Sequence, residues 1–288
     1  MKLISVGEII WDIYPDGAVI GGAPLNFCAH LSHLGDTAYL FSAVSGTDRY
    51  GKGAMEELAR HGVRTDLIQK NDRPTGSCLV TLDGYGVPCY EIAADCAHDH
   101  LTADEPTLDR IRSLGADVFS FNTLIQRNPD SRTALCRILA ACSFPEIFCD
   151  INLRKDCYDR AAVLRCLENA TCLKLSDSEA ETLRRMELLS AGTLDAVPEC
   201  LCRRYPNIRY AVLTLGADGS AVFDAAAGRL FRSGKPPRVQ VVSTVGAGDC
   251  YGATFLHGIH AGLSVGDAIA AATERSNLVV SHKEAVPF

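Results

Sequence analysis

The sequence predicts an α/β fold: a doubly wound, mostly parallel sheet with helices on both faces, and a small β-sheet lid beside it. Short apolar runs rich in β-branched residues recur along the chain, as expected for buried strands. Amphipathic stretches of helical length separate most of these runs, so we expect right-handed crossovers between parallel strands. One region, residues 75–92, instead has two strand-like runs with no helix between them.

The expected strands of the main sheet follow one another from the N-terminus. They are KLISVGEII (2–10), TAYLFSAVS (37–45), ADVFSFN (116–122), EIFCDIN (146–152), CLKLS (172–176) and YAVLTLG (210–216). The expected helices between them lie at 48–62, 130–142 and 177–189. Near the C-terminus, residues 241–255 have the form of a strand, a glycine turn and a helix.

Two extended excursions predict the lid. Residues 75–92, TGSCLVTLDGYGVPCYEI, are typical of a hairpin around a glycine-rich turn. The segment GAVIGG near residue 20 interrupts the first strand–helix connection in a similar way. We therefore expect a single domain over residues 1–288 with lid segments at about 13–21 and 75–100. The small sheet is either a surface decoration or a lid over a substrate.

Composition limits the classes of function. The chain has 288 residues, 47% of them hydrophobic, which is enough for one large α/β core. A net charge of −7 argues against a nucleic-acid partner. No apolar run approaches the roughly 18 residues of a membrane span, and the N-terminus lacks a signal-peptide pattern. The 13 cysteines are scattered without a C-x-x-C pair, so we expect a cytoplasmic protein with neither disulfides nor a zinc site.

The glycine turn at Gly246-Ala247-Gly248 begins like a dinucleotide fingerprint but does not continue as one. The third glycine of that fingerprint would fall at Tyr251, and the rest of the chain leaves no room for the second strand. No G-x-x-x-x-G-K-[ST] sequence occurs either. If the protein binds ATP, it does so through another architecture.

What remains is a helix whose first turn is Gly-Ala-Gly-Asp. The free N–H groups of a helix start attract anions, and glycines let a phosphate approach the backbone. Asp249 could simply be a favourable charge for the helix dipole. A carboxylate beside a phosphate cradle is repulsive, however, unless it has a role. Taking a proton from an attacking hydroxyl is such a role.

Two glycine-containing segments at opposite ends of the chain are GGAPLNFCAHLSHLG (21–35) and STVGAGDCYGATFLHGI (243–259). They resemble the N-terminal and C-terminal signatures, respectively, of a known family, the ribokinase-like (PfkB) carbohydrate kinases. Between them, in the family's order, lie SGTDRYGKGAMEELARHGV, NTLIQRNPDSR, CDINLRKDCYD, KLSDSEAETL and VLTLGADGSAVF, of which the second and third resemble the fructokinase branch. The resemblance spans essentially the whole chain. It implies a ribokinase-like fold and transfer of the ATP γ-phosphate to a sugar hydroxyl, with Mg²⁺.

The resemblance also implies roles for the matching residues. Asp249 would be the general base, and Gly246, Ala247 and Gly248 would form an anion hole for the transferred phosphoryl group. The positions that would contact the sugar are Asp12, Gly22 and Asn26. Arg154 would lie near the sugar or the phosphates. The positions that would border the nucleotide are Thr214, Gly216, Gly219 and Asn277. Glu179 would organise Mg²⁺ through water.

Several of these residues have a structural alternative. Asn26 follows Pro24 and could be ordinary first-turn polarity of a helix. Asp12 could cap a turn, and Arg154 could pair with Asp150 or Asp156. Glu179 sits in the first turn of a helix, where acids are favoured in any case.

The histidines are not expected to bind metal. His257 and His260 have helical spacing but no third ligand nearby, so we expect them on a helix surface. The HDH segment at 98–100 is expected in a solvated loop.

Two positions depart from the family pattern. Ser243 stands where the C-terminal signature normally has an aspartate that helps to bind a monovalent cation. A hydroxyl is a weaker ligand for a hard cation than a carboxylate, so weak K⁺ dependence or none is expected. Ser176 replaces the asparagine of the family's N-x-x-E motif, so weaker assistance to the metal from this motif is expected.

The combined expectation is an ATP- and Mg²⁺-dependent sugar kinase with fructose as the leading substrate. The alternative substrates are another ketose, a 2-keto-3-deoxy sugar acid, ribose or a nucleoside. A non-catalytic sensor that binds sugar and nucleotide is the alternative from another class, and the intact Asp249 argues against it. By family analogy, the lid could also join two copies into a homodimer.

Overall fold

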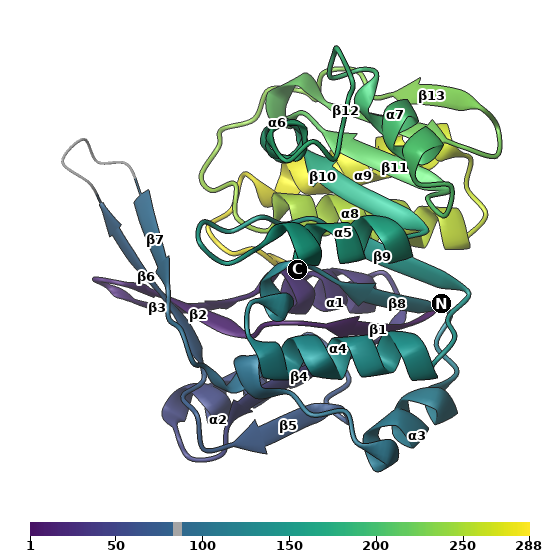
Figure 1. Cartoon of the computed structure of the whole chain (residues 1–288). Helices are drawn as coiled ribbons and strands as arrows, with labels where there is room; N and C mark the ends of the chain where they lie inside the picture. The colour runs from purple at the N-terminus through teal and green to yellow at the C-terminus, as the bar shows by residue number, and fades with distance from the viewer. Residues whose placement is uncertain (83–87) are drawn as a thin grey trace.

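A nine-stranded sheet forms the centre of the computed structural model, which describes residues 1–82 and 88–288 (Figure 1). The strand order is β13-β12-β11-β10-β9-β8-β1-β4-β5. The strands from β11 to β5 are parallel, and β12 and β13 pair antiparallel at one edge. The strands are β1 (Lys2–Val6), β4 (Thr37–Ser45), β5 (Ile68–Asn71), β8 (Val118–Phe121), β9 (Glu146–Asp150), β10 (Cys172–Ser176), β11 (Tyr210–Thr214), β12 (Ser220–Asp224) and β13 (Arg229–Arg232).

Helices cover both faces of this sheet, as the sequence predicts. Alternate residues of β1 enter different cores: Leu3 packs in one, and Ile4 and Val6 in the other. Figure 1 shows α4 and α5 in front of the sheet, and α1, α8 and α9 behind it. The helices with Leu3 are α1 (Ala23–His33), α2 (Arg49–Arg60), α8 (Ala247–His260) and α9 (Val265–Val279). Those on the opposite face are α3 (Glu105–Leu114), α4 (Pro129–Ala141), α5 (Arg160–Asn169), α6 (Asp177–Arg185) and α7 (Val197–Arg204).

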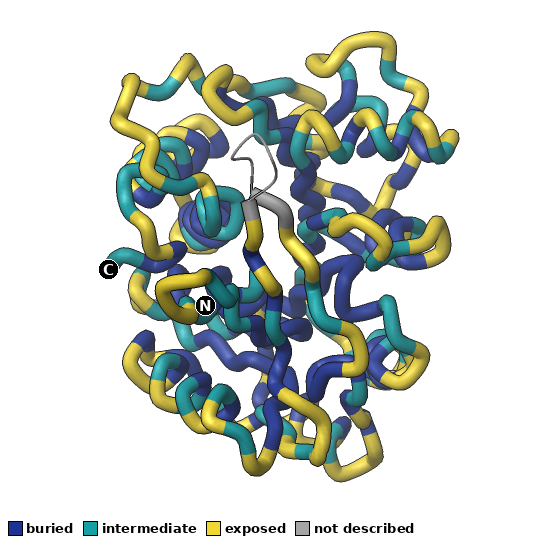
Figure 2. Tube along the Cα trace, turned by 90° about the vertical axis from the view of Figure 1, so that its left-hand side faces the viewer, coloured by how far each residue is buried: buried dark blue, intermediate teal, exposed yellow. Residues whose placement is uncertain are grey.

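A second sheet of four strands stands off the main body at the left of Figure 1. Its order is β3-β2-β6-β7, from β2 (Ile10–Tyr14), β3 (Gly17–Gly21), β6 (Gly76–Leu82) and β7 (Pro88–Ile92). In Figure 2 these strands face the viewer, with buried segments of the main body behind them. The hairpin expected at 75–92 is therefore β6 and β7. Its glycine-rich turn at 83–87 lies outside the described residues.

The small sheet differs in extent from the expected lid segments. It begins at Ile10, because the predicted strand 2–10 divides: β1 ends at Val6 and β2 starts a new sheet. The Gly7 N–H still donates to the Phe41 carbonyl of β4 at 3.1 Å, and a side chain at Gly7 would overlap the Pro24 ring, so glycine fits the point where the chain leaves the main sheet. At the other end, residues 93–100 leave the small sheet, and Ala97–His100 form a 3₁₀ helix.

The strand expected just before the glycine turn is wrong. Residues 241–245 have no strand, and Val241 is 61% exposed. The N–H of Val242 donates to the Val280 carbonyl at 2.8 Å, so this segment is fixed to the end of α9 and not to a sheet edge. In the described part of the chain, no helix combines the length and apolar character needed to cross a membrane.

Candidate active site

A cleft of about 390 Å³ lies between the small sheet and the carboxyl ends of the main strands. Ligands of open α/β sheets bind at this edge. The small sheet contributes Asp12 and Cys78, which are cross-strand neighbours. Residues at or just beyond the ends of β9, β10 and β11 form the opposite wall, and the first turns of α1 and α8 form the floor.

Asp249 lies on this floor and binds Asn26. Gly246 is the N-cap of α8 with φ of 80°, a conformation that favours glycine, and Asp249 follows in the first turn. Asn26 on α1 donates from its Nδ2 to Asp249 Oδ2 at 2.8 Å. Burial raises the pKa of Asp249, while the Asn26 hydrogen bond and the charges of Lys174 and Arg154 act against that rise. The result is a carboxylate with increased proton affinity in the first turn of a helix, where the Ala247 N–H already donates to the Thr244 carbonyl at 3.3 Å.

Lys174 places a buried positive charge against the same helix. Its Nζ lies 2.7 Å from Asp150 Oδ2, and the two residues are register partners on β10 and β9. Burial disfavours the ammonium, but the nearby carboxylates of Asp150, Glu179 and Asp249 together outweigh burial, so the pKa of Lys174 is raised. A Cβ on Gly248 would lie 3.1 Å from Nζ, and one on Gly252 3.3 Å from Cδ, so both glycines leave room for the lysine.

Lys174 and Glu8 are two buried charged groups of the site that the sequence analysis did not identify. Glu8 Oε1 accepts from the Ala23 N–H at 3.2 Å and its Oε2 from Asn122 Nδ2 at 3.0 Å. Burial raises the pKa of Glu8 to about 7. An acid inside the apolar run SVGEII is the signal that could have identified it, as the lysine inside CLKLS is for Lys174.

The four predicted sugar positions meet in the cleft. Asp12, Gly22, Asn26 and Arg154 all line it together with Asp249. Burial raises the pKa of Asp12 to about 6. Within residues 1–82 and 88–288, no carboxylate lies within ion-pair distance of Arg154. Neither Asp150 nor Asp156 pairs with it, since Asp150 is bound to Lys174.

The predicted anion-hole and nucleotide positions are only partly brought together. Gly246, Gly248 and Thr214 line the cleft. Ala247 begins α8 but is not among the lining residues.

The other nucleotide positions lie outside this lining. Gly216 and Gly219 flank the short 3₁₀ turn between β11 and β12, with φ of 55° and 91°. Asn277 on α9 donates to the Pro237 carbonyl at 3.1 Å.

Glu179 lines the cleft but also caps its own helix. Its Oε2 accepts from the Ser176 N–H at 2.7 Å, and its Oε1 accepts from the Leu153 N–H at 2.8 Å. These bonds fix the start of α6 and the loop after β9, which accounts for an acid at this position structurally. No group of three or more His, Cys, Asp or Glu side chains suited to a metal occurs in the described ranges.

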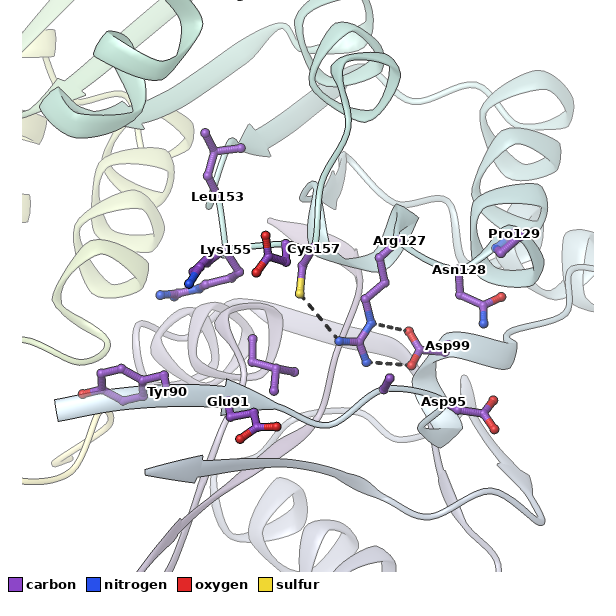
Figure 3. Close-up of a pocket in the computed structure, with 14 residues that line it drawn as sticks. Tyr90, Glu91, Asp95, Asp99, Arg127, Asn128, Pro129, Leu153, Lys155 and Cys157 are labelled. Atoms are coloured by element: carbon purple, nitrogen blue, oxygen red, sulfur yellow. Dashed lines mark hydrogen bonds and ion pairs between the residues drawn. The ribbon is translucent and has the colours of Figure 1, made fainter. Parts of the chain in front are cut away.

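The expectation of a solvated HDH loop is wrong. His98 and Asp99 are buried, and Asp99 forms an ion pair with Arg127 at 2.6 Å (Figure 3). Burial is possible because Arg127 neutralises the carboxylate. His257 and His260 lie on α8 as expected and reach Asp36 and Glu146 at 2.8 and 2.9 Å.

A second cavity of about 800 Å³ adjoins the cleft (Figure 3). Tyr90, Ile92 and Arg154 line both, so they form the boundary between them. Figure 3 shows Tyr90 and Glu91 on the small sheet opposite Leu153, Lys155 and Cys157. The cleft therefore has room beyond it on the side of Arg154.

Comparisons with known proteins agree with this architecture. Residues 17–287 match the family model "pfkB family carbohydrate kinase". The chain is 32% identical to the "Putative sugar kinase PH1459" of Pyrococcus horikoshii over 57% of its own length, and it spans 53%, about half, of that protein. It is 27% identical to fructokinase-1 of Zea mays, covering 89% of this chain and 82% of the relative.

Solved structures share the fold. The crystal structure of PH1459 in complex with ATP has a TM-score of 0.82 at 24% identity, covering 99% of this chain and 94% of that one. The 2-dehydro-3-deoxygluconokinase of Thermotoga maritima has a TM-score of 0.84 at 21% identity, covering 99% and 95%. At these identities the likeness is one of fold.

Proposed function

The chain belongs to the pfkB family of carbohydrate kinases, and from that premise we propose that it transfers the γ-phosphoryl group of ATP to a hydroxyl of a small sugar, with fructose as the leading acceptor. One observation carries the proposal. The Asp249 carboxylate, held by Asn26, lies at the open start of α8 within a cleft that also contains Asp12 and Arg154. A base beside an anion-binding helix start is what hydroxyl phosphorylation requires.

The proposed reaction uses these groups in order. Asp249 accepts the proton of the sugar hydroxyl while that oxygen attacks the γ-phosphorus in line. The bond from phosphorus to the bridging oxygen breaks and leaves ADP. The N–H groups of Gly246, Ala247 and Gly248 and the Lys174 ammonium stabilise the negative charge that develops on the phosphoryl oxygens.

The residues present fit a magnesium ion that arrives with the nucleotide. Mg²⁺ keeps several waters and takes one or two carboxylates besides the phosphates, so it needs no cage of protein ligands. Glu179 lines the cleft, and its carboxylate oxygens have lone pairs beyond those used in capping the helix. It would hold the ion through water, as proposed from the family resemblance. The ion would neutralise charge on the phosphates.

Two acceptor classes are favoured by specific observations. Fructose is supported by the similarity to fructokinase-1 of Zea mays over most of both chains. A 2-keto-3-deoxy sugar acid is supported by Arg154, which lines the cleft without an ion-pair partner in the described residues and could bind a sugar carboxylate. The two acceptor classes predict different effects of the Arg154→Gln substitution. The substitution should raise the KM for a 2-keto-3-deoxy sugar acid strongly, and the KM for fructose little.

The test is ADP release from Mg·ATP with fructose, tagatose, ribose, 2-keto-3-deoxygluconate and adenosine, for the wild type and Asp249→Asn. We expect turnover of one acceptor and a loss of about 10²- to 10⁴-fold in kcat for the variant, the usual contribution of a general base. Asp267→Asn is the matched control, because Asp267 is the third residue of α9 as Asp249 is of α8. It should keep the wild-type rate.

Two outcomes would contradict the proposal. If no acceptor is turned over while ATP and a sugar still bind, the protein is a sensor and not a kinase. If Asp249→Asn and Asp267→Asn have equal effects, Asp249 acts only as a favourable charge at a helix start.

A further inference from the structure

A third, much smaller cavity lies behind Asp249, on the side away from the small sheet. Its volume is about 20 Å³, which suffices for one water molecule. Its polar lining consists of Ser5, Ser120, Asn122, Asp150 and Asp249, and its apolar lining includes Phe27, Phe121 and Phe148. Asp150 and Asp249 also line the large cleft, so these two carboxylates separate the two spaces.

One oxygen in this polar lining, Asp150 Oδ1, lacks a hydrogen-bond donor in the described part of the chain. Asp150 Oδ2 is bound by Lys174, but its Oδ1 is buried and has no hydrogen-bond partner among the described residues. A buried carboxylate oxygen without a donor is costly. The serines at the base of the cavity are almost fully buried and are direct register partners on the parallel strands β1 and β8. Their hydroxyls can donate to a molecule in the cavity, but water is the only common molecule of that size that can also donate twice.

We propose that this cavity binds one water molecule that donates a hydrogen bond to Asp150 Oδ1 and another to the Asp249 carboxylate, and that Asp150 positions the base through this water. Ser5 and Ser120 would donate to the water oxygen. The inference rests on the proposed function for its catalytic consequence, but not for the presence of the water.

The catalytic consequence concerns the proton affinity of the base. A hydrogen bond donated to an ionised carboxylate favours the ionised form and lowers its pKa. Burial raises the pKa of Asp249, so the water would work in the same direction as Asn26 and keep the base ionised. The charged groups that face Asp249 are Lys174 on β10, Asp150 on β9, Arg154 beyond β9 and Glu8 beyond β1. All of them stay in place if only the water is removed.

Ser120→Val tests the proposal because it fills the cavity with a methyl group and leaves both carboxylates unchanged. We expect the acid limb of the pH profile of kcat/KM to move up by about one pH unit, the size of one hydrogen bond to a charged group. Ser120→Ala, which removes the hydroxyl but leaves room for the water, should give less than half of that shift. Ser42→Val controls for overpacking, because Ser42 is a buried serine on the neighbouring strand β4 outside this cavity.

Two kinetic outcomes would overturn the proposal. In one, the acid limb of Ser120→Val coincides with that of the wild type. In the other, Ser120→Ala or Ser42→Val shifts the limb as far as Ser120→Val does, which would assign the effect to the hydroxyl or to packing.

A crystal structure of the wild-type protein tests the water itself, even if the valine variant does not fold. We expect one ordered water within hydrogen-bond distance of both carboxylates, and its absence at high resolution would overturn the proposal. This measurement needs no activity. A wild type without turnover but with the water present would therefore contradict the proposed function and leave the water site standing.

Discussion

Asp249 and Asp267 have the same position in their helices but different surroundings. On α9, Ser264 at the N-cap accepts from the Asp267 N–H and donates to its carboxylate at 2.6 Å, so that acid is used in capping. On α8 the N-cap is Gly246, which has no side chain, so the carboxylate of Asp249 binds Asn26 and faces the cleft. The glycine therefore leaves the start of α8 without a side-chain cap, as the proposed roles of this turn and of Asp249 require.

Glu8 makes the stability of the protein dependent on pH. Burial raises its folded pKa to about 7 from the ordinary value of 4.5, so the folded state binds the proton more tightly than the unfolded state between these values. Its stabilising contribution is complete below about pH 4.5 and is lost as the pH rises through 7. Relative to Glu8→Gln, the wild type should lose about 3 kcal/mol of unfolding free energy over this range.

Denaturant unfolding of the wild type and Glu8→Gln at a series of pH values measures this difference. Glu56→Gln, at an exposed position on α2, is the control and should show a difference that does not change with pH. A constant difference for Glu8→Gln as well would mean that Glu8 is ionised in the folded protein at pH 5.

At the scale of secondary structure, apolar runs predicted the strands that are buried on both faces. TAYLFSAVS and CLKLS coincide with β4 and β10. The same rule failed where contacts distant in sequence decide the path of the chain. Residues 2–10 are divided between two sheets, because β1 pairs with β4 and β8 whereas β2 pairs with β3 and β6. In residues 241–245, the Val242 N–H donates to Val280 instead of to a strand.

For the site residues, too, the sequence predicts those in a contiguous motif but not those whose partners lie far away in the chain. The sequence predicts Asp249 as a candidate base because the Gly-Ala-Gly-Asp turn is contiguous in the chain. Lys174 binds Asp150, and Glu8 binds Asn122; these partners lie 24 and 114 positions away in the sequence. A charged residue in an apolar run can be noticed in the sequence, but its partner is known only from the fold.

The turn before α8 is the basis for a prediction about the dependence of the rate on monovalent cations. Ser243 Oγ accepts from the Val245 N–H at 3.2 Å, so the hydroxyl holds the turn where the family signature has a carboxylate. Replacing K⁺ by tetramethylammonium should change the rate by less than about twofold, because a site without this carboxylate binds a hard cation weakly. Ser243→Asp should introduce K⁺ activation.

Initial rates at constant ionic strength in the two salts measure both effects. Ser281→Asp is a control for added negative charge, since Ser281 follows α9 and lies outside the cleft lining. Strong K⁺ activation of the wild type would show that other oxygens of the turn complete the cation site.

At the scale of the whole molecule, the small sheet has two unlike faces. Asp12 and Cys78 point into the cleft, so Ile13 and Leu79, the next residues on β2 and β6, point away from it. These two are register partners, and Leu79 is 49% exposed. The outer face of the lid therefore presents the apolar pair Ile13 and Leu79, with Glu91 as the cross-strand partner of Leu79, on an element that projects from the body (Figure 1).

This outer face predicts a homodimer joined through the small sheet. A self-complementary apolar patch at a two-fold axis buries the same side chains from both copies, so one substitution acts twice. Leu79→Glu should place two carboxylates in the contact and shift the protein to a monomer in sedimentation velocity at micromolar concentration. Leu263→Glu is the matched control, because Leu263 is 44% exposed in the turn between α8 and α9, away from the lid, and should leave the mass unchanged. A wild type that sediments as a monomer, or a Leu79→Glu variant that remains a dimer, would contradict this assembly and leave the lid as a cover for the cleft alone.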